Sequence, residues 1–164
     1  MYEQIKEPKK QLSKDAVKVW LISETISNII GFVILGVLLY LDYRFSWKEW
    51  IGWIIIGITI FSILSTVWSF INPFLLYKSW RYDVDEEFLH LKSGVLKEEY
   101  RLIPMTKIQS VSTTQGPLLR KYGLSSVVIE TMASSYPIPA LPINVAVGLR
   151  KQIAEYAKIK EVEE

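Results

Sequence analysis

Residues 50–77 read WIGWIIIGITIFSILSTVWSFINPFLLY, and these 28 residues contain no formal charge. A second uncharged run of 17 residues, Thr25 to Leu41, precedes them. At 1.5 Å per helical residue the runs extend about 42 Å and about 26 Å, against a hydrocarbon core of about 30 Å. Two buried helices of a soluble bundle are the alternative, but neither run offers a polar face to water. We therefore expect a transmembrane hairpin spanning 19–77, with helices at about 19–41 and 50–72 and with Asn72-Pro73 ending the second.

The composition of the 164 residues excludes several other classes. Half of the residues are hydrophobic, and the formal net charge is only +2, which does not favour nucleic acid as a partner. The chain has no cysteine and a single histidine, His90. Disulfides, cysteine-ligated metals and sites with two imidazoles are thus impossible, and we expect neither a metal nor a cofactor.

Basic residues near the helix ends predict the orientation. A basic tail, 1–18, carries five lysines, and Lys78 and Arg81 follow the second run, whereas the connecting loop has only Arg44 and Lys48. This asymmetry of seven against two places both termini in the cytoplasm of a bacterium, with the protein in its inner membrane.

Small hydroxyl residues recur on one face of the second helix, at Thr59, Ser62, Thr66 and Ser69. Such residues allow close helix approach, so we expect a helix contact here, with the first helix or with a partner protein in the membrane. Glu24 and Asn28 lie one turn apart in the first helix, and Glu24 is near enough to the inner interface to reach water.

From about residue 78 the pattern changes to short alternating runs typical of β-strands. Strands are expected at 80–84, 89–92 and 95–103, with Ser93-Gly94 turning the chain between the last two, and at 107–113, 126–131 and 136–141. Ile143 to Lys158 has helical periodicity, with Pro142 suited to its first turn. The prediction for 78–164 is a strongly curved antiparallel sheet of six or seven strands, closed by one C-terminal helix.

Two strings of residues resemble a known family. The strings are Ile103-Pro104 with Lys107-Ile108-Gln109, and Gln115-Gly116-Pro117-Leu118 with Gly123-Leu124. With the helix pair before them, they resemble the bacterial pleckstrin-homology-like, membrane-flanked domain proteins of the YdbS type. The resemblance implies an α+β membrane protein: a two-helix transmembrane hairpin followed by a PH-like barrel or sandwich capped by a helix. It also implies that some relatives take part in resistance to antimicrobial peptides, beside a larger related protein.

The second string has a physical interpretation of its own. Gly116 and Gly123 are expected to need unusual backbone torsions, and 115–124 is either a structural corner or a ligand site. Lys78, Arg81, Arg120 and Lys121 are candidates for contact with anionic lipid, at about 1 kcal/mol each. Residues 83–87 hold four acids in the loop between the first two strands, where eukaryotic relatives bind phosphoinositides, so that binding is not expected here.

No catalytic motif is present in the sequence. Nucleophile elbows, paired zinc histidines and glycine-rich phosphate loops are all absent, and His90 is expected to be exposed or loosely bonded in mid-strand. We therefore expect a non-enzymatic scaffold that docks a protein through a sheet edge or beside the last helix. The partner is a larger related PH-like protein or another copy of the chain; the alternative function is sensing of anionic lipid or amphipathic peptides.

Overall fold

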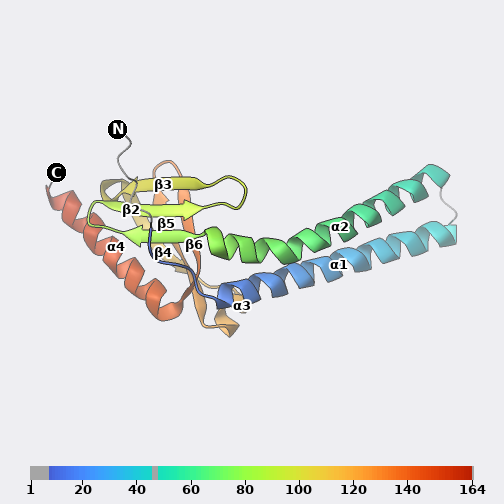
Figure 1. The fold of residues 1–164 in the computed structure, drawn as a ribbon, viewed down its shortest axis with the longest axis horizontal. Helices are drawn as coiled ribbons and strands as arrows, with labels where there is room; N and C mark the ends of the chain where they lie inside the picture. The colour runs from blue at the N-terminus through green and yellow to red at the C-terminus, as the bar shows by residue number, and fades with distance from the viewer. Residues whose placement is uncertain (1–7, 46–47, 164) are drawn as a thin grey trace. The chain divides into compact units, whose positions relative to one another are not determined.

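The computed structural model describes residues 8–45 and 48–163 and divides the chain into two compact units (Figure 1). One unit is the helical hairpin Trp20–Phe74, and the other joins the N-terminal residues through Val19 to the chain from Leu75 onward. Residues 1–7 of the predicted basic tail, residues 46–47 of the predicted loop and Glu164 lie outside the described residues.

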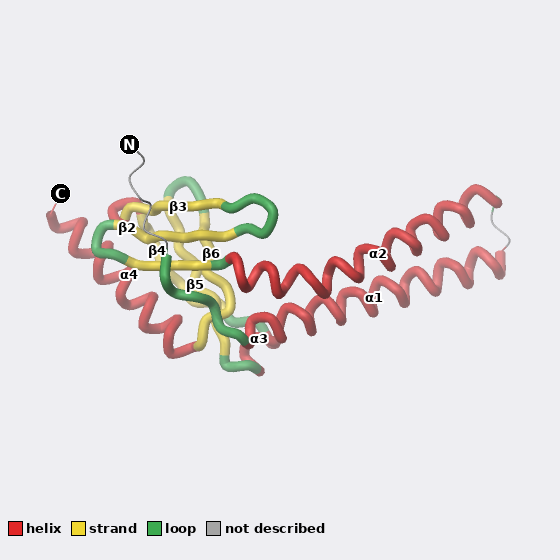
Figure 2. The backbone as a smooth tube through the Cα atoms, in the orientation of Figure 1, coloured by secondary structure: helices red, strands yellow, loops and turns green. Residues whose placement is uncertain are grey.

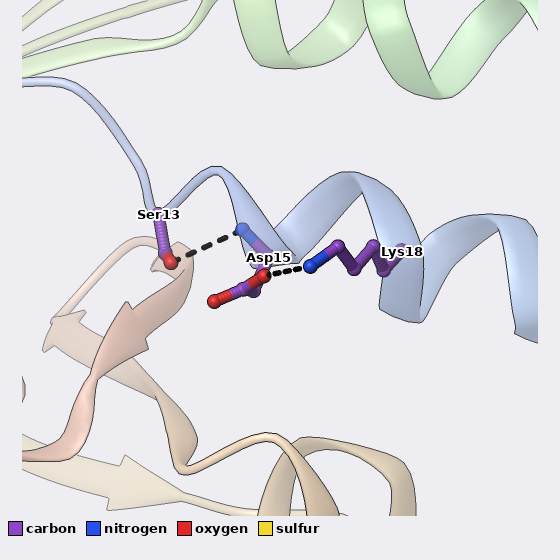
Figure 3. Close-up of polar contacts among 3 residues, drawn as sticks. All are labelled: Ser13, Asp15 and Lys18. Atoms are coloured by element: carbon purple, nitrogen blue, oxygen red, sulfur yellow. Dashed lines mark hydrogen bonds and ion pairs between the residues drawn. The ribbon is translucent and has the colours of Figure 1, made fainter.

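The first helix, α1 (Asp15–Phe45), begins earlier than the uncharged run because polar groups fix its first turn. The Asp15 amide donates a hydrogen bond to Ser13 Oγ at 3.3 Å, and Lys18 Nζ lies 2.7 Å from Asp15 Oδ1 (Figure 3). A serine before the first turn satisfies an amide that has no helical partner, and an acidic side chain there complements the helix dipole. The helix therefore starts at Asp15 rather than at Val19.

The second helix, α2 (Glu49–Ser79), continues past the proline that was expected to end it. Pro73 lies inside the helix, so the prediction of an end at Asn72-Pro73 is wrong. A proline removes only its own N–H donor, and membrane helices tolerate this loss because neighbouring groups satisfy the freed carbonyl. The ladder resumes beyond it, since the Trp80 amide donates to the Leu76 carbonyl at 3.1 Å.

Both helices are long and apolar enough to span a membrane, and almost no residue of either apolar segment is buried within the protein. Such surfaces would face water at great cost in a soluble bundle, whereas in a bilayer they face lipid. Both helices are therefore candidate membrane-spanning segments, in agreement with the sequence-based expectation.

The other unit contains two antiparallel three-stranded sheets and a C-terminal helix (Figure 2). The first sheet has the order β1-β2-β3 and the second β4-β5-β6. The elements are β1 (Arg81–Val84), β2 (Phe88–Ser93), β3 (Glu99–Pro104), the 3₁₀ turn η1 (Met105–Lys107), β4 (Ile108–Thr114), the short helix α3 (Pro117–Lys121), β5 (Leu124–Thr131), β6 (Ser135–Pro142) and α4 (Ile143–Glu163). The α+β class, the hairpin of β2 with β3 and the helix after β6 are as predicted.

The strands form two separate sheets, not the single curved sheet that was expected. Pro104 cannot donate to a ladder, and the Met105 amide instead bonds the Glu87 carbonyl at 3.0 Å. The η1 turn then redirects the chain, so that β4 pairs with β5 rather than with β3. The result is an open sandwich.

Apolar side chains from both sheets and from one face of α4 form the core. Leu89 on β2, Ile129 on β5 and Ile153 on α4 are completely buried. The helix packs against η1, β4, β5 and β6 through positions spaced by three and four residues, Ala146, Leu149 and Ile153.

The described part of the predicted tail, residues 8–18, belongs to this core rather than hanging free. Lys10 forms a bridge with Tyr82 of β1, with hydrogen bonds of 3.0 and 3.1 Å in both directions. Three residues later the Ser13 amide donates to the Ala140 carbonyl of β6 at 3.4 Å, and Leu12 between them is only 4% exposed. Residues 10–13 thus connect the outer strand of one sheet to the outer strand of the other.

Candidate interaction surfaces

The described residues do not form a metal site, since no group of three histidine or carboxylate side chains in them could hold a metal ion. His90 was expected to be exposed or loosely bonded, but its Nε2 lies 3.0 Å from Asp85 Oδ2 and its side chain is 18% exposed. The pair joins mid-β2 to the end of β1. Glu98 and Glu99 have separate partners, Lys92 and Arg101 respectively.

The turn between β1 and β2 is acidic, as the sequence indicates. Only Asp85, Glu86 and Glu87 lie between the strands, because Asp83 and Val84 belong to β1. Three adjacent carboxylates repel a phosphate group, and this argues against phosphoinositide binding at this turn.

Three of the four candidate lipid contacts are exposed, and the fourth has internal partners. Lys78 is exposed in the last turn of α2, and Arg120 and Lys121 are exposed on α3. Arg81 Nη1 instead donates to the Lys78 and Trp80 carbonyls at 2.9 and 2.7 Å. Arg120 and Lys121 are adjacent in the last turn of α3, and we name these two residues the basic cluster.

The second family string, residues 115–124, connects β4 to β5. Gln115 Nε2 donates to the Leu124 carbonyl at 2.7 Å, and the Gly123 carbonyl accepts from the Ile143 amide at 3.1 Å. Gly123 has φ +63°, which favours glycine, but Gly116 has an ordinary φ of −77°, so the expectation of an unusual torsion at Gly116 is wrong.

The remaining residues of the strings divide by exposure. The buried residues are Ile103, Ile108 and Leu124, and the half-buried ones are Pro104 and Leu118. Lys107, Gln109 and Pro117 are exposed.

The hydroxyl residues of α2 mostly bond within their own helix. Thr59, Ser62 and Thr66 each donate to the carbonyl four residues earlier, at 2.8 to 2.9 Å. Ser69 also accepts a hydrogen bond from Asn28 Nδ2 of α1 at 2.8 Å. Beside this link lies a small open cleft of about 130 Å³, lined by Ser27, Asn28, Gly31, Phe32, Ser62, Ser65 and Thr66.

The outer edge of β3 is a surface that sequence reasoning missed. Tyr100 is 43% exposed and Leu102 is 55% exposed, while the charged residues between and beside them lie on the opposite face. Alternation alone would turn Tyr100 and Leu102 inward. The register settles the matter, because residues directly opposite share a face: Leu89 opposes Ile103 in the core, whereas His90 opposes Leu102 on the outside.

No described strand pairs with the outer side of β3, and the backbone groups of Tyr100 and Leu102 are directed to that side. The Phe88 carbonyl accepts from the Asp85 amide at 2.9 Å, so the backbone of Phe88 is directed toward β1. Because this direction alternates along an antiparallel strand, Leu89 and Leu91 are directed toward β3 and bond Ile103 and Arg101. The N–H and C=O groups of Tyr100 and Leu102 are consequently directed away from β2.

The other three outer strands are protected in ways that β3 is not. β1 has four residues and is bridged by Lys10, and β4 has a register shift between Ile108 and Ser110. β6 contains Pro137 and Pro139, which have no N–H, and accepts Ser13. Short length, bulges and prolines are common protections of sheet edges. Among the described strands, β3 is the edge best suited to pairing.

A pair of membrane-length helices joined to two small antiparallel sheets and a packed C-terminal helix defines a membrane-anchored domain of the pleckstrin-homology class. Residues 18–157 match the family described as Bacterial PH domain, and the chain belongs to this family. It is similar to the UPF0699 transmembrane protein YdbS of Bacillus subtilis (strain 168), with 36% identity over 155 residues that cover 94% of this chain and 96% of YdbS. No solved structure matches the chain. The predicted family is therefore confirmed.

Proposed function

We propose that this chain is a non-enzymatic subunit, anchored in the bacterial inner membrane, that binds another protein through its PH domain. The single observation that supports this most is the open edge of β3, where exposed Tyr100 and Leu102 accompany outward-directed backbone groups. Such an edge accepts an extended segment of a partner by strand addition. The partner is a membrane protein, either a larger PH-like relative or another copy of this chain.

The proposed orientation has both termini in the cytoplasm, supported by the seven basic residues on that side against two in the loop. A reporter fused after the C-terminus should be active only in the cytoplasm; periplasmic activity would refute the orientation.

Because relatives of the resembled family are associated with antimicrobial-peptide resistance, we propose that the subunit takes part in envelope defence. A deletion strain should become more sensitive to cationic peptides, and an unchanged sensitivity would contradict this role.

Affinity purification of the full chain in mild detergent tests the binding function. We expect Leu102→Lys to lose the proteins that travel with the wild type, because a lysine on an edge strand discourages pairing. Val145→Lys is the matched control, since Val145 is also an exposed apolar residue, 40% exposed, but lies on α4. Equal recovery of the same proteins with all three chains would refute binding through β3.

A second candidate function, contact with anionic lipid, is supported by the basic cluster. Each lysine or arginine near an anionic surface contributes about 1 kcal/mol. The test adds phosphatidylglycerol to the delipidated full chain in detergent and measures the bound lipid by native mass spectrometry. Replacing both Arg120 and Lys121 by glutamate should reduce the amount of lipid bound. Exposed Lys107 and Lys151 supply the matched control pair. Equal lipid binding by both double variants would refute a specific role for the basic cluster.

A further inference from the structure

The charges along β3 favour one register for its pairing with β3 of a second copy. When two β3 edges pair antiparallel, the outward-directed backbone groups of one strand must face those of the other. This condition is met only when Tyr100 lies opposite an even-numbered residue. In the register that places Glu99 opposite Glu99, and in the one that places Arg101 opposite Arg101, like charges meet. Pairing centred on Tyr100 instead places Glu99 opposite Arg101 twice.

We propose that β3 pairs antiparallel with β3 of a second copy, centred on Tyr100, and so joins the two three-stranded sheets into one of six strands. This partner rests on the proposed function and specifies it. The arrangement is two-fold symmetric, and each Glu99 meets the Arg101 of the other copy at a position without backbone hydrogen bonds, where side chains are closest.

The contacts within one chain already prepare this surface. Glu99 Oε2 lies 2.5 Å from Arg101 Nη2, and Arg101 also lies over the Tyr136 ring, 5.5 Å from its centroid. The guanidinium is thus held beside the edge. On the outer face Lys92 lies over the Tyr100 ring at 4.8 Å, and Lys92 Nζ is 3.2 Å from Glu98. The side chains that would flank the two-fold axis are therefore ordered by neighbours on their own sheet.

Cross-linking tests the predicted centre directly, because the chain has no cysteine of its own. In the Tyr100→Cys variant of the full chain, in native membranes, a short bismaleimide should join two copies, since directly opposed residues of a bonded pair have Cα atoms about 5.5 Å apart. Lys151→Cys, exposed on α4, is the control and should remain monomeric. Equal dimer yields from both variants, or none from Tyr100→Cys, would overturn the proposal.

Charge exchange tests the register independently of the contact within one chain. Glu99→Arg alone and Arg101→Glu alone each place like charges opposite each other twice, so self-association of either should weaken by about tenfold or more. Mixed together, the two variants place opposite charges at both positions and should form a heterodimer. A mixture that associates no better than either variant would refute the register; if a variant is misfolded by hydrogen exchange, the Tyr100→Cys result decides.

The outcomes separate this inference from the proposed function. If Tyr100→Cys yields no dimer while Leu102→Lys still loses a different co-purifying protein, the second copy is the wrong partner and binding through β3 stands. If Tyr100→Cys yields no dimer and Leu102→Lys retains all co-purifying proteins, both the inference and the proposed function fail.

Discussion

Replacing Leu12 by alanine tests whether residues 8–18 are part of the folded domain. Leu12 is only 4% exposed and lies between the hydrogen bonds that join residues 10–13 to β1 and β6. The change deletes three carbon atoms, about 2.4 kcal/mol at 0.8 kcal/mol per buried methylene. The cavity left behind adds to this, so we expect a loss of about 3 kcal/mol in the free energy of unfolding.

The loss should be large enough to measure in the full chain. For a domain of about one hundred residues, 3 kcal/mol lowers Tm by about 15 °C. Near-ultraviolet circular dichroism in mild detergent reports the packing of the aromatic side chains, and hydrogen exchange should show lower protection in β1 and β6. Lys14→Ala, two residues away and exposed, should change the stability by less than about 0.5 kcal/mol.

Equal stability of the two variants would refute the reasoning. It would mean that the segment does not stabilise the folded domain, and that the buried position of Leu12 contributes nothing.

Three further predictions concern the PH domain, each measured by urea unfolding of the full chain in detergent. Gly94 has φ +115° and a Cβ there would collide with a backbone carbonyl, so Gly94→Ala should cost more than about 2 kcal/mol while Gly116→Ala costs less than about 0.5; equal costs would contradict the strain argument. Gln115→Ala leaves a carbonyl without its donor and should cost about 1–2 kcal/mol, against a negligible change for exposed Gln109→Ala; the argument fails if the two match. Burial raises the pKa of the Tyr82 hydroxyl above its ordinary value of 10, so stability that is present below pH 10 is lost as the pH rises through the folded pKa, and Tyr82→Phe should reduce this alkaline loss; an identical loss in wild type and variant would refute it.

The outer face of β3 illustrates why the candidate site was harder to predict than the fold. The residues that alternate with Tyr100 and Leu102 along β3 are Glu99, Arg101 and Ile103. They lie on the inward face, although two of them are charged, because pairing with β2 fixes the register. Charged side chains are tolerated there since Arg101 has both Glu99 and the Tyr136 ring as partners. Local alternation contains no information on this register, so neither the exposed apolar pair nor the free edge could be inferred before the fold was known.

The sequence by itself determined the two long apolar helices, the approximate positions of the strands, the final helix and the family. These features depend on long uncharged runs and on periods of two and of three to four residues, which are local properties of the chain. Only the tertiary structure decided that α2 continues through Pro73, that the strands divide into two sheets, and that residues 10–13 join β1 to β6. Each of these depends on which groups far apart in the sequence satisfy one another's hydrogen bonds and apolar surface, and the free energy of those contacts exists only once the chain has folded.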